Sequence, residues 1–311
     1  LLHVTPLRQA LTAQTAKTLS EVLDTKVHLD DVRIGLFNRL LLSGVRIEDK
    51  QGENLLIADA ISAKIALKPL ITGGEVVLRT VSLLDTKLNL YQAQPNAPTN
   101  FQFVLDAFAS KDKNTAQKPL NLTIGSLIIR RTNIKFDKRY EPRKTASIDP
   151  AHLYLTGIDA NMSLMHLTED SISLRVRSLA FAEQSGLNLK HLSFQLRANQ
   201  KQARIDNFEL KLPNTHIVEK NIGLHYKGRN FADILKTLRM EANNLSMVLN
   251  TNDITPLIPN LQGWDLLLSI QTPKIFYSPN LIKLSGLNVI EQNNNFALKG
   301  TLQAFLLQEK I

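Results

Sequence analysis

The sequence predicts a mainly β protein built from antiparallel strands that keep one face in water. Short stretches alternate strictly between apolar and polar residues, as residues 192–197 (LSFQLR) do. Side chains of a strand point to opposite faces with a period of two, so each stretch builds a strip with one apolar and one polar side. The polar positions are mostly Arg, Lys, Asn, Ser and Glu. Parallel strands buried on both faces would instead show continuous apolar runs.

The order of elements begins with a helix over residues 1–24, where Thr5 and Pro6 suit the N-cap and the first helical position. A first β-unit is expected over 25–92, with turns at 49–54 and 73–74. Residues 93–118 combine prolines and a polar stretch with a short helical pattern, which predicts a helix-containing linker. Strands are expected again over 119–311, with helical turns near 230–238 and 253–261.

The predicted sheet is long enough to require curvature, because open twisted sheets rarely exceed about ten strands without curling or splitting. We therefore expect an antiparallel meander that curls into an elongated trough. Its apolar side is rich in Leu, Ile and Val, which suit a lining for acyl chains and equally an ordinary core. The expected lining residues are Val45, Ile47, Ile61, Ile65, Leu67, Val81, Leu83, Leu88, Leu90, Ile134, Phe136, Ile172, Leu174, Val176, Leu192, Phe194, Leu196, Phe208, Leu210, Leu212, Ile222, Leu224, Leu245, Met247 and Leu249.

Composition excludes several classes of function. The chain of 311 residues has no cysteine, so it has no disulfide and no thiolate metal site. Its seven histidines are scattered without the spacing of helical zinc ligands. We find no phosphate-binding loop or nucleophile elbow either, and we expect neither an enzyme nor a cofactor. No run of 18 apolar residues occurs, so any membrane anchor is expected upstream of Leu1.

One charge cluster stands out against a net charge of +9. Basic residues gather between 130 and 144 and alternate with two aromatic residues. Such a cluster can bind lipid headgroups or the phosphates of a nucleic acid, although a solvated hairpin edge is the commoner outcome. The candidates for headgroup binding are Arg130, Arg131, Lys138 and Arg139. Nucleic-acid binding is the weaker of the two functional interpretations.

Several segments resemble the N-terminal region of the TamB and AsmA-like proteins of Gram-negative bacteria. These segments are 18–23 (TLSEVL), 27–29 (VHL), 32–34 (VRI), 42–49 (LSGVRIED), 55–61 (LLIADAI) and 81–88 (VSLLDTKL). Residues 181–187 (FAEQSGL), followed by His191 and Leu192, resemble the Bacteroidetes form of this family. The resemblance covers most of the chain, but the defining C-terminal region of the family is missing.

The resemblance implies a periplasmic protein that is anchored in the inner membrane and acts in outer-membrane biogenesis. It implies a long β-groove that conducts phospholipids, and a partner among the assembly factors of the outer membrane. The sequence leaves a second function open: a structural or protein-binding scaffold whose apolar face is a closed core without lipid transport.

Overall fold

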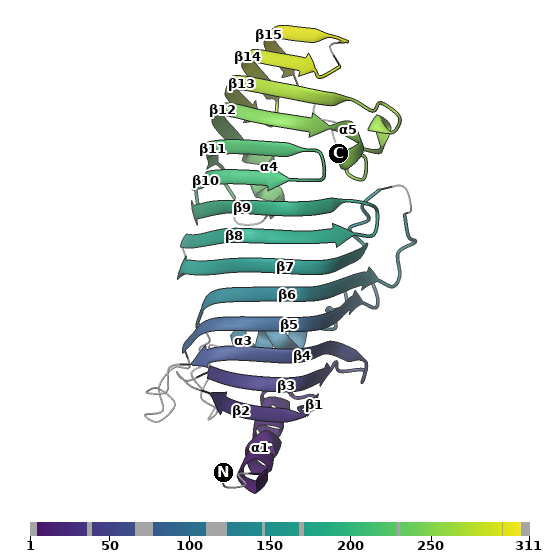
Figure 1. Cartoon of the computed structure of the whole chain (residues 1–311), viewed down its shortest axis with the longest axis vertical. Helices are drawn as coiled ribbons and strands as arrows, with labels where there is room; N and C mark the ends of the chain where they lie inside the picture. The colour runs from purple at the N-terminus through teal and green to yellow at the C-terminus, as the bar shows by residue number, and fades with distance from the viewer. Residues whose placement is uncertain are drawn as a thin grey trace. The chain divides into compact units, whose positions relative to one another are not determined.

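The computed structural model describes residues 5–35, 39–65, 77–109, 123–144, 147–167, 171–228, 231–293 and 295–305. The described part is mainly β, as predicted (Figure 1). Its helices are α1 (Thr5–Leu23), α3 (Gln102–Ala109), α4 (Phe231–Thr237), α5 (Thr251–Ile254) and a 3₁₀ turn (Pro259–Leu261). The strands are β1 (Val27–His28), β2 (Asp31–Gly35), β3 (Arg39–Glu48), β4 (Asn54–Ile65), β5 (Val77–Gln92), β6 (Thr123–Lys138), β7 (His152–Leu167), β8 (Ser171–Glu183), β9 (Asn188–Asn199), β10 (Gln202–Lys211), β11 (His216–His225), β12 (Arg239–Asn250), β13 (Leu267–Ser278), β14 (Leu281–Glu291) and β15 (Ala297–Phe305).

The strands form one sheet in nearly sequential order. The order is β1, β3, β4 and then each following strand in turn up to β15. β2 pairs with β3 outside this order. The N-terminal helix and the three predicted short helical segments are confirmed. Close contacts divide the chain into two compact units. Unit 1 comprises Leu1–Asn161 and Phe181–Gln184, and unit 2 comprises Met162–Ala180 and Ser185–Ile311.

The prediction of a purely antiparallel sheet is wrong at one pair of strands. β5 and β6 run parallel, with Val77 opposite Thr123 and Gln92 opposite Lys138. A parallel pair needs a long crossover between its strands, usually one that contains a helix. The chain between β5 and β6 provides this crossover and carries α3. The predicted helix-containing linker therefore returns the chain to the starting end of β5, and the sheet is mixed.

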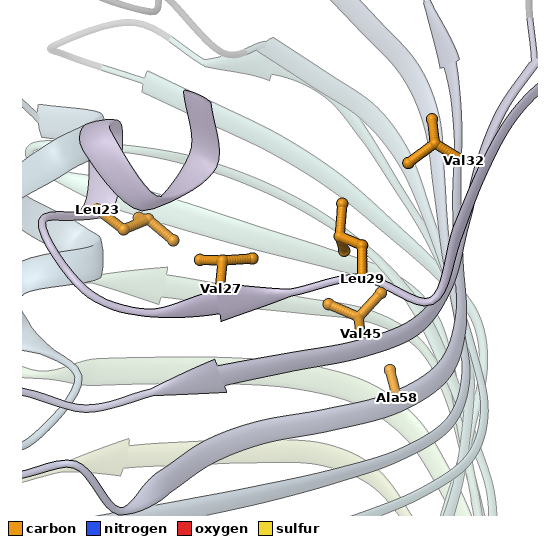
Figure 2. Close-up of a cluster of buried hydrophobic side chains, with 6 residues drawn as sticks. All are labelled: Leu23, Val27, Leu29, Val32, Val45 and Ala58. Atoms are coloured by element: carbon orange, nitrogen blue, oxygen red, sulfur yellow. The ribbon is translucent and has the colours of Figure 1, made fainter. Parts of the chain in front are cut away.

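The core of unit 1 lies where α1 meets the apolar face of β3 and β4. Figure 2 shows Leu23 and Val27 directed toward the same region as Val45 and Ala58. These residues form a buried cluster with Leu29 and Val32, and apolar side chains of α1 and α3 pack against it. The apolar face of β3 and β4 is therefore covered by helices.

Polar contacts fix α1 in this position. The Thr12 hydroxyl accepts a hydrogen bond from the Val32 amide at 3.0 Å, and the Ser20 hydroxyl accepts one from the Val27 amide at 3.0 Å. Arg8 donates two hydrogen bonds to Asp31, at 2.5 and 2.6 Å. Helix and sheet are thus joined by directional contacts at the edge of the apolar cluster.

Acid should loosen this attachment. Hydrogen bonds from Arg8, and then Arg33, outweigh partial desolvation and lower the pKa of Asp31 from 3.8 to about 2. Because the folded-state pKa lies below the unfolded one, the stabilisation is present above about pH 4 and is lost as the pH falls toward 2. We expect the protection of the Val32 amide against hydrogen exchange to fall in this interval. An Asp31→Asn variant should lack this step, and an identical pH profile in both proteins would contradict the assignment.

Candidate functional site

The candidate site is the apolar face of unit 2, which three cross-strand rows define. Residues directly opposite one another on paired strands lie on the same face of a sheet. Row A is Leu192, Leu210, Ile217, Met247, Ile270, Val289 and Leu298; row B is Leu196, Ile205, Ile222, Ala242, Ile275, Leu284 and Leu302; and row C is Ala198, Ala203, Leu224, Met240, Tyr277, Ile282 and Ala304. Each row crosses the seven strands from β9 to β15 without a charged residue. At about 4.8 Å between strands, a row extends about 29 Å.

The opposite face of the same strands is polar. One of its rows is Ser193, Glu209, Val218, Ser246, Gln271, Asn288 and Lys299. On this face Asp206 receives hydrogen bonds from both Arg197 and Arg204, and these contacts lower the pKa of Asp206 despite its partial burial. The two-faced sheet that the alternation predicts is therefore present in unit 2.

The inner strands of unit 2 carry one extra residue between rows A and B, and the alternation of faces therefore changes between the two rows. Four residues separate the rows on β9 (Leu192 to Leu196) and on β15 (Leu298 to Leu302), whereas five separate them on each strand from β10 to β14. The register accordingly shifts only between β9 and β10 and between β14 and β15 within this group of strands. An odd spacing in a regular strand would turn one row to the polar face.

Left-handed residues absorb the extra length in three of the five inner strands. Asn207 in β10, Asn244 in β12 and Gly286 in β14 have φ angles of 53°, 64° and 66°. Glycine and asparagine adopt this conformation more readily than most residues, and such bulges bend a strand and increase its local twist. Unit 1 has counterparts at Gly44 and Asp85. Alternation alone did not predict these phase changes, although glycine or asparagine within a strand is a signal for them.

Row A shows how incompletely this face is covered. Each of its residues up to Val289 is only half-buried, and Leu298 is 50 % exposed. On row B, Leu302 is 44 % exposed, although Ala242 and Ile275 are buried. The large apolar side chains of row A thus remain in contact with solvent across seven strands.

The predicted lining residues fall into two groups. In unit 1, Val45, Ile47 and Ile61 belong to the face that α1 and α3 cover. Cross-strand pairing places Val81, Leu83, Leu88, Leu90, Ile134 and Phe136 in the continuation of these rows on β5 and β6. Leu67 and the side chain of Ile65 lie outside the described residues.

In unit 2, the predicted lining residues Leu192, Leu196, Leu210, Met247, Ile222 and Leu224 lie in the three rows. Phe194, Phe208 and Leu245 stand between rows A and B, while Leu212 and Leu249 continue the face beyond row A. On β8, Ile172, Leu174 and Val176 alternate with Ser173 and with the exposed Arg175 and Arg177. The expected lining residues ended at Leu249 and so left out β13, β14 and β15, although Leu287 and Val289 on β14 show the same alternation.

The four basic candidates for headgroup binding lie beside acidic partners. Arg131 makes two hydrogen bonds of 2.6 Å to Asp85 and lowers the pKa of that carboxyl group. The other three candidates form ion pairs, which are Arg139 with Glu53 at 2.6 Å, Lys138 with Glu141 at 2.8 Å, and Arg130 with Asp159 at 3.8 Å. The Arg139 guanidinium also lies 3.4 Å from the centre of the Tyr91 ring. Much of the charge in this cluster is therefore offset locally.

The described residues contain neither a metal-binding cluster nor a membrane-spanning helix. No group of three or more histidines and carboxylates lies close enough to hold a metal ion there. None of the helices in the described ranges combines the length and the apolar character needed to cross a membrane.

No protein-family model matches the chain, and no curated protein matches it.

Gly286, the left-handed residue in β14, has little room for a side chain. A Cβ atom on Gly286 would lie 3.1 Å from two ring carbons of Pro273. Together with the positive φ angle, this contact should make Gly286→Ala lower the free energy of unfolding by about 1–2 kcal/mol. Gly223→Ala on β11 is the control, because its Cβ would meet no atom closer than the Glu241 carbonyl oxygen at 3.8 Å. Equal urea midpoints for the two variants would contradict the proposed strain.

Glu219 lies opposite Phe208 on the apolar side and is 2 % exposed. Its Oε1 accepts a hydrogen bond from the Asn221 amide, whereas its buried Oε2 has no hydrogen-bond partner among the described residues. Since an unpartnered buried carboxylate oxygen is costly, Glu219→Met should raise the free energy of unfolding by about 1–3 kcal/mol. Glu209→Met, which removes a carboxylate paired with Lys211, should give no gain. Destabilisation by Glu219→Met would show that the carboxylate has a partner.

Proposed function

We propose that the apolar face of unit 2 binds the acyl chains of lipids. The observation that carries the proposal is row A, a line of large apolar side chains across seven strands in which no residue is fully buried. Continuous exposed apolar patches above a few hundred Å² are uncommon on soluble monomers and usually mark a binding surface. Rows A to C contain no charged residue, and such rows suit a ligand that offers only methylene groups.

The wider function follows from joining this face to the family resemblance of the sequence. We propose that the chain is the periplasmic part of a TamB-like or AsmA-like protein anchored in the inner membrane of a Gram-negative bacterium. In this role the curved apolar face conducts phospholipids toward the outer membrane, where an assembly factor is the expected partner. Curvature is supported by the left-handed residues that interrupt the strands. No enzymatic step is part of the proposal.

The alternative is a structural or protein-binding scaffold. Unit 1 favours it locally, because α1 and α3 cover the apolar face there and bury Val45 and Ala58 to 1 % exposure. A face closed in this way needs no lipid. The two functions therefore differ in what contacts row A of unit 2.

Neighbouring residues on β10 and β13 provide a matched test. A photo-crosslinking amino acid at Leu210, on row A, should capture phospholipid in cells, whereas the same group at Lys211, on the polar face, should not. Ile270→Asp should reduce the lipid that copurifies by about tenfold or more, since a charge would be placed against acyl chains. Gln271→Asp on the polar face is the control.

Two results would contradict lipid binding by this face. One is equal capture of lipid at Leu210 and Lys211, which would mean that the label reports general proximity to membranes. The other is crosslinking at Leu210 to a protein alone, which would favour the scaffold.

A further inference from the structure

A basic cavity lies at one end of the strands of unit 2, where the β9–β10, β11–β12 and β13–β14 connections meet. It has a volume of about 1290 Å³. The β9–β10 turn contributes Lys201, the connection from β11 through α4 to β12 contributes Lys227, Lys236 and Arg239, and the β13–β14 turn contributes residues 278–280. The cavity is thus large enough for a polar molecule and receives its cations from separate parts of the chain.

The charges of this cavity are unbalanced. Among the described residues that line it there is no aspartate or glutamate, and Lys201, Lys227, Lys236 and Arg239 form no ion pair with any described residue. Some other cations of unit 2 do have an acidic partner, as Arg197 has in Asp206 on the polar face. Several like charges around one cavity repel each other and create a positive potential that attracts an anion.

The cavity walls are held by hydrogen bonds that do not use the cations. The Tyr226 hydroxyl donates to the Asn199 carbonyl oxygen at 2.8 Å, and the Tyr226 amide donates to the Lys201 carbonyl oxygen at 3.0 Å. The Lys227 amide donates to the Thr237 hydroxyl at 2.8 Å. The backbone of the cavity is therefore formed in advance, and the ammonium and guanidinium groups remain available to a ligand.

The cavity is also next to the apolar face. Tyr226, which lines the cavity, stands two positions after the row C residue Leu224 and so continues the side of the apolar face. His225 and Arg239 pair next to Leu224 and Met240, point to the opposite face and line the cavity as well. On β13 and β14 the row C pair Tyr277 and Ile282 encloses the turn at residues 278–280. A molecule with an anionic end and an apolar tail could place each end against the matching surface.

We propose that this cavity binds a phosphate group, namely the headgroup phosphate of a phospholipid whose acyl chains lie on rows A to C. The assignment rests on the proposed function for the apolar tail, whereas the phosphate site itself rests on the unpaired cations. Ammonium and guanidinium groups bind phosphate oxygens through charge-assisted hydrogen bonds. A soluble organic phosphate offers the same chemistry, so an experiment must separate the two sources.

The test uses the full chain and a double variant, Lys201→Gln with Arg239→Gln. The matched control is Lys220→Gln with Lys274→Gln, which removes the same charge from exposed positions outside the cavity. Binding is measured to vesicles of phosphatidylcholine with and without phosphatidylglycerol, and separately to glycerol 3-phosphate in solution. We expect the cavity variant to lose about tenfold or more in affinity for the vesicles with phosphatidylglycerol, and the control to change little.

The outcomes separate the possible sources and failures. Loss of glycerol 3-phosphate binding in the cavity variant, with unchanged vesicle binding, would support the phosphate site and assign it to a soluble ligand. An equal loss of vesicle binding in both variants would overturn the site, because it would show attraction by net charge alone. Lipid capture at Leu210 is measured in the same samples. If the unmodified chain captures no lipid at Leu210, the proposed function fails. If lipid is captured there but the unmodified chain, the cavity variant and the control bind vesicles equally, only the headgroup site is overturned.

Discussion

The dominant physical constraint on this protein is the cost of leaving the apolar face of a sheet in water. Each Å² of apolar surface withdrawn from water contributes about 25 cal/mol, so a face that crosses many strands must find a cover. In unit 1, α1 and α3 provide it, and the result is a buried cluster around Val45 and Ala58. In unit 2, row A retains half-buried Leu, Ile and Met side chains. The same two-faced strands thus lead to a closed core on β3 and β4 of unit 1 and to a candidate binding surface in unit 2.

This separation of faces depends on backbone conformation as much as on composition. Five inner strands of unit 2 carry an extra residue between rows A and B, which in a regular strand would send part of the apolar set to the polar side. Asn207, Asn244 and Gly286 adopt the left-handed conformation at these positions. The face therefore remains apolar along both halves of each strand while the strands bend.

Alternation in the sequence was sufficient to predict a mainly β chain with one apolar face, and Thr5 and Pro6 indicated the N-terminal helix. It was not sufficient to predict the parallel pairing of β5 and β6, because pairing depends on contacts between distant segments and alternation is the same in either direction. The phase changes at Asn207, Asn244 and Gly286 were also missed. Their residue types were a usable signal, since asparagine and glycine are unfavourable within ordinary strands.

The candidate headgroup residues show a similar limit. The sequence indicated a basic cluster at Arg130 to Lys144, but it could not show that Asp85 and Glu53, distant in sequence, lie beside Arg131 and Arg139. The cations of the unit 2 cavity instead come from two separate connections, which are β9–β10 and β11–β12. A local count of charges cannot detect such a cavity, because its lining residues are scattered between positions 199 and 280.

The central claim is that the apolar face of unit 2 is a surface for lipid and not an unoccupied core. Native mass spectrometry of the unmodified chain, purified from cells without detergent, tests it most directly. Lipid binding predicts a population whose mass exceeds that of the chain by one or more phospholipids and that reverts to the bare chain on collisional activation. A spectrum that contains only the bare chain, from preparations in which added phospholipid also fails to bind, would contradict the claim.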